Sequence, residues 1–234
     1  MGWFQKKPAL AAPSRGAPLT PPAAHPLREL LFGDRPLEEW ARGGDEPGSG
    51  EPWARFADAL TRRGRGDAAG ARDALAAVLR QPGLESRHYL QAWYALRGLS
   101  EDPAPAEGKH VYGVIVDMPM PAGLDTLAAY EDRSARFLSH GGRAIIWDHP
   151  DTSLDAESDA LLAAGRTLVS QIGPWVGERP PLPPHEARIS ILTPSGLHFG
   201  QGALGIFQRD ARAAPVLAAA TALMRALIAK SQPR

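Results

Sequence analysis

Hydrophobic residues in the first half of the chain recur every three to four positions, as they do on one face of an α-helix. The first run, 53–64, begins behind Pro52, a residue favoured at helix starts. The second run, 67–82, begins at Asp67, whose carboxylate can cap the first free amides, and the third covers about residues 86–97. We therefore predict three helices that pack as an antiparallel stack.

After Gly108 the hydrophobic positions alternate and Val and Ile become frequent, which is typical of β-strands. Two stretches keep the helical period: 154–172, with Ser153 or Asp151 near its cap, and 214–230. This order of elements predicts an antiparallel sheet covered by two helices, so the expected fold class is α+β. The alternating runs that we predict to be strands are 110–118, 124–130, 135–140, 143–148, 188–193 and 197–201.

Proline and glycine divide the chain into parts. Residues 8–26 are rich in Pro and Ala and poor in bulky apolar side chains, so we predict that residues 1–26 form a disordered tail. A second break, at 101–108, separates a helical domain, 27–100, from an α+β domain, 109–234.

Composition narrows the classes of function. At 44% hydrophobic and 22% charged residues the chain can bury a core, and 26 basic side chains balance 26 acidic ones. A net charge of zero gives no field that would draw nucleic acid or an anionic membrane. The absence of cysteine excludes a disulfide framework, a thiol nucleophile and a thiolate metal site. Without a signal peptide or a long uninterrupted apolar run, we expect a cytoplasmic protein with no integral membrane segment.

Six residues in and around the second predicted helix form a spaced pattern: Gly66, Asp67, Ala71, Leu75, Val78 and Pro82. With residues 53–60 as its first helix, this segment resembles a tetratricopeptide repeat. The resemblance covers residues 53–98 and no second copy is present. It implies binding of a protein or peptide rather than catalysis.

A glycine-rich segment, 193–202, surrounds one hydroxyl and one imidazole, Ser195 and His198. With Asp148 or Asp117, these residues would supply a nucleophile, a base and an orienting carboxylate for a Ser/His-dependent hydrolase. There is no Gly-x-Ser-x-Gly elbow. The competing interpretation is a structural hairpin in which Ser195 satisfies the turn.

Metal and nucleotide sites are not predicted. His140, Asp148, His149 and Asp151 lie close in sequence, but their spacing favours strand ends and a helix cap over metal ligation. The glycines at 200–202 lack the lysine of a phosphate-binding loop. We therefore expect no metal and no cofactor.

Aromatic residues off the predicted core face, Tyr89 and Tyr94, are candidates for binding a protein partner. The segment 1–7 could also dock on a partner, and strand 188–193, if it lies at a sheet edge, could pair with a second copy. The sequence therefore favours a non-catalytic interaction or regulatory (adaptor) protein. The alternatives are the Ser/His hydrolase and a homodimerising scaffold.

Overall fold

The computed structural model describes residues 24–41 and 50–231. The predictions made for segment 1–7 and for nearly all of the Pro-rich stretch 8–26 therefore lie outside the described residues.

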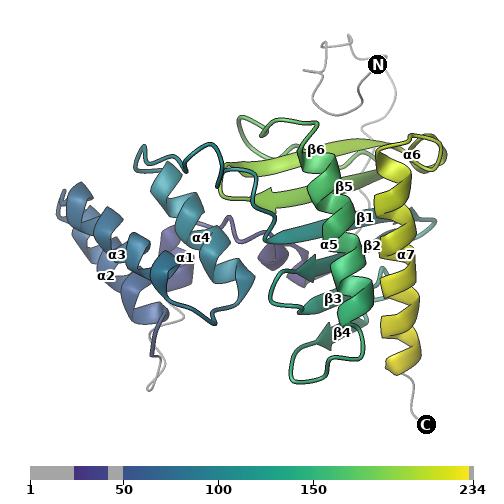
Figure 1. Cartoon of the computed structure of the whole chain (residues 1–234), viewed down its shortest axis with the longest axis horizontal. Helices are drawn as coiled ribbons and strands as arrows, with labels where there is room; N and C mark the ends of the chain where they lie inside the picture. The colour runs from purple at the N-terminus through teal and green to yellow at the C-terminus, as the bar shows by residue number, and fades with distance from the viewer. Residues whose placement is uncertain (1–23, 42–49, 232–234) are drawn as a thin grey trace.

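The fold is α+β, as the alternating and helical patterns predicted. A single antiparallel sheet runs in the order β4-β3-β2-β1-β5-β6, with helices before and after its strands (Figure 1). The strands are β1 (Gly113–Met120), β2 (Gly123–Tyr130), β3 (Ala135–Leu138), β4 (Ala144–Trp147), β5 (Glu186–Thr193) and β6 (Gly196–Ala203).

The strand order corrects the expectation that residues 188–193 form a sheet edge. β5 lies inside the sheet, because it pairs with β1 on one side and with β6 on the other. The sheet edges are β4 and β6. A second copy of the chain therefore has no free β5 edge to pair with.

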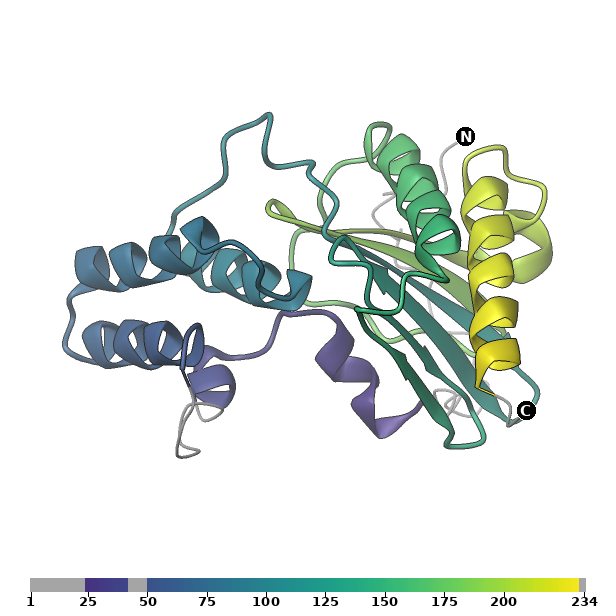
Figure 2. The ribbon, with the colours of Figure 1, turned by 60° about the horizontal axis from the view of Figure 1, so that its bottom comes forward.

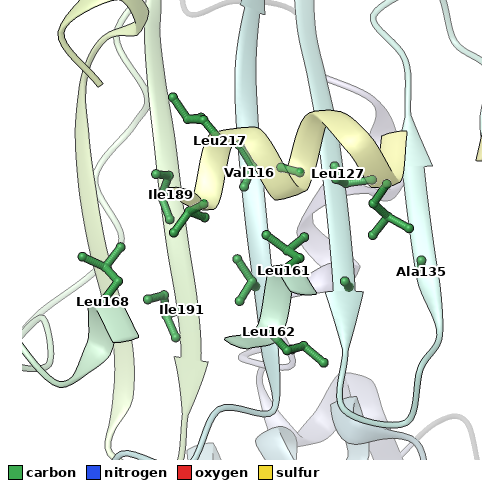
Figure 3. Close-up of a cluster of buried hydrophobic side chains, with 14 of the residues drawn as sticks. Val116, Leu127, Ala135, Leu161, Leu162, Leu168, Ile189, Ile191 and Leu217 are labelled. Atoms are coloured by element: carbon green, nitrogen blue, oxygen red, sulfur yellow. The ribbon is translucent and has the colours of Figure 1, made fainter. Parts of the chain in front are cut away.

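Two helices, α5 (Asp155–Val169) and α7 (Ala213–Lys230), cover one face of the sheet, together with the short α6 (Leu204–Phe207). The strand side chains that alternate toward this face meet the apolar stripes of both helices, as Figure 3 shows. Most of this cluster is less than 3% exposed. Its labelled members include Val116, Leu127, Ala135, Leu161, Leu162, Leu168, Ile189, Ile191 and Leu217.

The cap predicted for α5 is different in the structure. Leu154 is the N-cap residue and makes no side-chain cap bond. Asp151 instead accepts the backbone N–H of Ser153 at 2.8 Å, in the turn that precedes the helix.

The helical part consists of α1 (Leu37–Ala41), α2 (Trp53–Gly64), α3 (Ala68–Arg80) and α4 (Ser86–Arg97). Asp67 caps α3 as predicted, since its Oδ1 accepts the Gly70 N–H at 2.8 Å. α2, α3 and α4 pack around a buried cluster of their own, and Trp40 of α1 stacks on Trp53 with 5.3 Å between ring centroids.

The opposite face of the sheet is covered by a 3₁₀-helix, η1 (Pro26–Leu31), which the sequence patterns did not reveal (Figure 2). Arg28 reaches Asp117 on β1 through two hydrogen bonds of 2.8 and 2.5 Å, and both side chains are buried. The Tyr130 hydroxyl donates to the Leu31 carbonyl at 2.6 Å. These bonds fix η1 against the centre of the sheet.

The helical part is joined to the sheet through α4. At the start of this helix, Ser86 and Asp132 of the β2–β3 turn exchange hydrogen bonds of 2.6 and 3.1 Å. In its middle, the buried Gln91 amide bonds both the N–H and the carbonyl of Arg35. Gly33 lies so close to α4 that an added Cβ would stand 2.8 Å from the Cβ of Leu90. The chain between η1 and α1 is therefore clamped against α4.

By length and composition alone, α7 could also cross a membrane. The core helix of a globular protein has the same properties, and here Val216, Leu217 and Leu223 pack into the cluster between the helices and the sheet. The apolar composition of α7 is therefore only weak evidence for a membrane-spanning helix.

Gly165 provides a test of the packing of α5. A Cβ added there would meet Val114 Cγ2 on β1 at 2.5 Å, and a buried branched side chain cannot move away easily. We expect Gly165→Ala to lower the free energy of unfolding by about 1–2 kcal/mol, measured by urea denaturation.

The matched control is Gly64→Ala at the end of α2, where an added Cβ meets nothing within 4 Å. The higher helix propensity of Ala should leave this variant as stable as the wild type or more stable by up to about 1 kcal/mol. Equal effects at both positions would contradict the close packing of α5 on β1.

Candidate functional site

A groove of about 870 Å³ lies between the helical part and one end of the sheet, and we call it the main groove. One wall is formed by α4 and the segment 32–38, and the other by the loop 174–179. Its floor is the β5–β6 hairpin at Ser195, Gly196 and Leu197. Segments distant in sequence therefore build one surface.

The α4 wall follows from helix periodicity. Leu90, Tyr94 and Arg97 are spaced by four and three residues, so they lie on one side of α4. Leu90 is buried against Phe32, while the Tyr94 side chain is 38% exposed. The helix thus offers an aromatic ring and a guanidinium to the groove.

The facing loop is held by the edge strand. The backbone N–H of Trp175 donates to the Leu197 carbonyl at 2.7 Å. The Trp175 ring contacts the Phe199 ring of β6, with 5.1 Å between the ring centroids. Its indole N–H is satisfied by the Glu178 carbonyl at 3.0 Å. The next residue, Val176, is 89% exposed. The loop therefore presents an apolar side chain on a fixed backbone.

Arg97 joins the α4 wall to the floor of the groove. Its guanidinium donates to the Pro194 carbonyl in the β5–β6 turn and lies beside Gly196, whose φ of +112° is a conformation that favours glycine. Burial lowers the pKa of Arg97, and Asp102 and Asp34 offset this only through space. Among the described residues, no carboxylate forms an ion pair with it.

A second hollow of about 670 Å³, which we call the side lobe, continues the main groove and shares Asp34, Tyr94, Gly177 and Arg179 with it. Arg179 pairs with Glu29 at 2.8 Å and with Asp34 at 3.4 Å, and it lies 3.6 Å above the Phe32 ring. Burial raises the pKa of Asp34. Burial has the same tendency at Glu29, but Arg179 and Arg28 outweigh it and lower the pKa of that carboxyl.

Arg188 lines the side lobe from β5 and is 1% exposed. Its guanidinium donates to the Gln201 side chain and to the carbonyls of Pro180 and Pro181 at 2.8 and 3.1 Å. Because its partners are neutral oxygens, burial lowers the pKa of Arg188 to about 10. Its Nε and Nη2 donors are occupied by these protein oxygens, which favours a structural role.

The structure brings Ser195 and His198 together. The Ser195 hydroxyl lies 3.1 Å from His198 Nε2, 2.6 Å from the Gly108 carbonyl and 3.0 Å from the Thr193 hydroxyl. His198 is fully buried, and its Nδ1 forms no hydrogen bond of normal geometry. Burial lowers the pKa of His198 to about 4, which the backbone of Ile172 offsets only in part.

The position of the Ser195 hydroxyl proton decides the role of the contact between Ser195 and His198. The Gly108 carbonyl can only accept, so the single hydroxyl proton of Ser195 goes to it. When that proton stays on the Gly108 side, the contact with His198 needs the ring proton on Nε2, a tautomer in which the imidazole cannot take a proton from Ser195. The arrangement favours a structural role for Ser195, whose hydroxyl links the β5–β6 turn to the loop before β1.

Neither carboxylate considered for a triad is near this pair. Asp148 follows edge strand β4 and pairs with Arg136 at 2.8 Å, whereas His198 lies on the opposite edge strand, β6. Five strand spacings of about 4.8 Å separate the two edges by about 24 Å. Asp117 lies on the sheet face that carries Arg28, opposite to the face on which His198 lies beside Ile191.

Of the two tyrosines proposed for partner binding, Tyr94 lines both hollows. Tyr89 is engaged within the protein: its hydroxyl donates to the Gln81 carbonyl at 2.6 Å and accepts from the Leu84 N–H, and its ring stacks on Tyr112. The structure therefore leaves Tyr94 available and Tyr89 occupied.

The residues weighed as metal ligands are separated by their pairings. His140 bonds Asp125 at 2.7 Å, and His149 bonds Asp155 at 3.1 Å. Within the part of the chain that the structure describes, no group of three or more His, Asp or Glu side chains is placed to hold a metal ion.

Sequence reasoning missed Arg97, Trp175 and the segment 32–38 as site residues. Arg97 occupies the last turn of a predicted helix, where a basic residue is ordinary. Trp175 lies in an irregular loop without periodicity. No local signal relates these residues, because only the tertiary fold brings them together.

In comparisons with known proteins, the chain matches no family model, no curated protein and no solved structure with significance. The resemblance of residues 53–98 to a tetratricopeptide repeat therefore rests on those residues alone.

The low pKa of His198 predicts a pH-dependent stability. An unfolded chain takes up a proton below about pH 6.5, but the folded protein resists protonation of this ring down to about pH 4, so stability falls as the pH falls through this window. Between pH 7 and pH 5 the wild type should lose ~2 kcal/mol more than His198→Gln. Urea unfolding at both pH values measures this, and other histidines cancel in the difference. Equal losses would show that His198 titrates normally.

Proposed function

We propose that this protein is a non-catalytic interaction protein that binds a protein partner in the main groove. The observation that carries the proposal is the composition of the walls: Tyr94 and Arg97 on one side face Trp175 and Val176 on the other. Tyrosine, tryptophan and arginine are enriched among the few residues that dominate the binding energy of protein interfaces.

The size and placement of the groove support the same proposal. The main groove of about 870 Å³ and the adjoining side lobe of about 670 Å³ together exceed the roughly 300–1,000 Å³ of a small-molecule pocket, which leaves room for a stretch of polypeptide. Both the helical part and the sheet line it, so binding would need the whole chain rather than residues 27–100 alone.

The alternatives have less support. For the hydrolase, the proton of Ser195 is directed to a backbone carbonyl and His198 is enclosed. For the homodimerising scaffold, the strand expected to pair with a second copy is internal. No observation favours either over partner binding.

The test is site-specific cross-linking in the native cell. A photoreactive amino acid replaces Val176 on the groove wall or, as the control, Ile146, which is 59% exposed on the opposite edge strand β4. We expect one partner to be captured from position 176 and not from position 146. Mass spectrometry of the adduct identifies the partner.

Binding of that partner to purified protein is then measured for Tyr94→Ala and for Ile146→Ala, each of which removes an exposed apolar side chain. Tyr94→Ala should weaken binding about tenfold or more, because the ring lies where the two hollows meet, and Ile146→Ala should leave it unchanged. Thermal melts check that both variants fold. A partner that binds all three proteins equally would refute the proposed surface.

A further inference from the structure

Two of the three arginines that line the main groove are paired with carboxylates. Arg63 bonds Glu38, and Arg179 pairs with Glu29 and Asp34. Arg97 has no such partner within the described residues: its guanidinium donates to the Pro194 carbonyl. Because a guanidinium stays protonated in proteins, Arg97 carries a positive charge in the groove that Asp102 and Asp34 offset only through space.

We propose that Arg97 binds the carboxylate of an Asp or Glu side chain within an extended segment of the partner protein. This inference rests on the proposed function and adds the chemistry of the ligand. A planar guanidinium with free N–H groups is well suited to a carboxylate, which can accept two of its hydrogen bonds at once.

The Arg97 guanidinium keeps donors for that carboxylate. Its Nη1 donates to the Pro194 carbonyl, whereas Nε and Nη2 have no hydrogen-bond acceptor within the described residues, and this edge of the group can donate two parallel bonds. Gly196 packs against the guanidinium, since an added Cβ would stand 3.8 Å from its Cζ, Nε and Nη2 atoms, at ordinary van der Waals distance. The positive φ of Gly196 favours glycine at this point of the turn.

The charges of the residues that line the two hollows also favour an acidic ligand at Arg97. The lining carboxylates without an ion pair among the described residues are Asp102 in the main groove and Glu178 in the side lobe, and both residues are exposed. Water and salt screen exposed charges strongly, whereas the half-buried Arg97 is screened less. The least screened unpaired charge of the main groove is therefore that of Arg97, and an acidic group complements it.

Apolar contacts on either side of Arg97 indicate a peptide segment rather than a small anion. Tyr94 lies one turn before Arg97 on α4, and Val176 projects from the facing loop. Because the groove opens into the side lobe, a chain can pass through it, which favours an internal acidic side chain over a terminal carboxylate.

The experiment selects random nine-residue peptides, displayed with both ends fused to carrier sequence, on the immobilised full-length protein. We expect the enriched peptides to share an Asp or Glu at a fixed spacing from an aromatic or aliphatic residue. Each is synthesised with Glu or Asp and with Gln or Asn at that position, and binding is measured by fluorescence polarisation. The acidic form should bind about tenfold more tightly to the wild type.

A double-mutant cycle assigns this preference to Arg97. In Arg97→Gln the acidic and amide peptides should bind within about threefold of each other, whereas Arg80→Gln, an exposed arginine on α3, should keep the full preference. Arg97→Gln retains side-chain N–H donors toward Pro194, and a thermal melt confirms its folding. Because the peptide pair changes no protein residue, the preference of the wild type is informative even if this variant is unstable.

The outcomes separate the two proposals. Enriched peptides that lose affinity in Tyr94→Ala but show no acidic preference, or one that survives in Arg97→Gln, would overturn the role of Arg97 and leave the groove as a binding surface. A selection that yields no peptide dependent on Tyr94 would count against both.

Discussion

The buried pair of Arg28 and Asp117 is the interaction on which the arrangement of the chain depends. Asp117 accepts two hydrogen bonds from Arg28 and a third from the Thr126 hydroxyl at 2.7 Å, in the middle of the sheet face. Loss of one partner from a buried ion pair costs about 3–5 kcal/mol, since the other charge stays buried without a partner. This pair therefore fixes η1, and with it the segment 32–38 that leads into the helical part and forms part of one groove wall.

From that anchor the helical part is placed by short-range contacts rather than by a large shared core. Gln91 clamps the backbone of Arg35, and the Ser86–Asp132 exchange holds the start of α4 on the β2–β3 turn. Tyr112 packs against the cluster inside the helices and also against the one on the sheet. The groove is the space left where these contacts end, between α4 and the hairpin that Arg97 holds.

The sequence predicted the elements well because periodicity is a local property. The change from helical to alternating hydrophobic positions after Gly108 corresponds to the end of the helical part and the start of β1. It could not reveal η1, because a six-residue 3₁₀-helix has little period and is held by a carboxylate 89 residues away. The order of the strands in the sheet could not be predicted either, because it depends on pairings between distant segments. The strand β5 was therefore expected at an edge. The glycine-rich segment singled out Ser195 and His198, but their hairpin spacing did not establish that they touch, and the acceptor that decides the meaning of the contact, Gly108, is distant in sequence.

The walls of the groove are fixed before any ligand arrives. The hairpin is bound to α4 through Arg97, the facing loop is bound to β6 through the Trp175 N–H, and Arg179 ties that loop to Asp34 on the first wall. A partner that binds here would order few side chains of this protein, so little of its interaction energy would be spent on conformational entropy. Since Val176 and Tyr94 are the large exposed hydrophobic side chains that line the main groove, a modest number of contacts can give specific binding, and the unpaired Arg97 guanidinium sets which sequence is preferred.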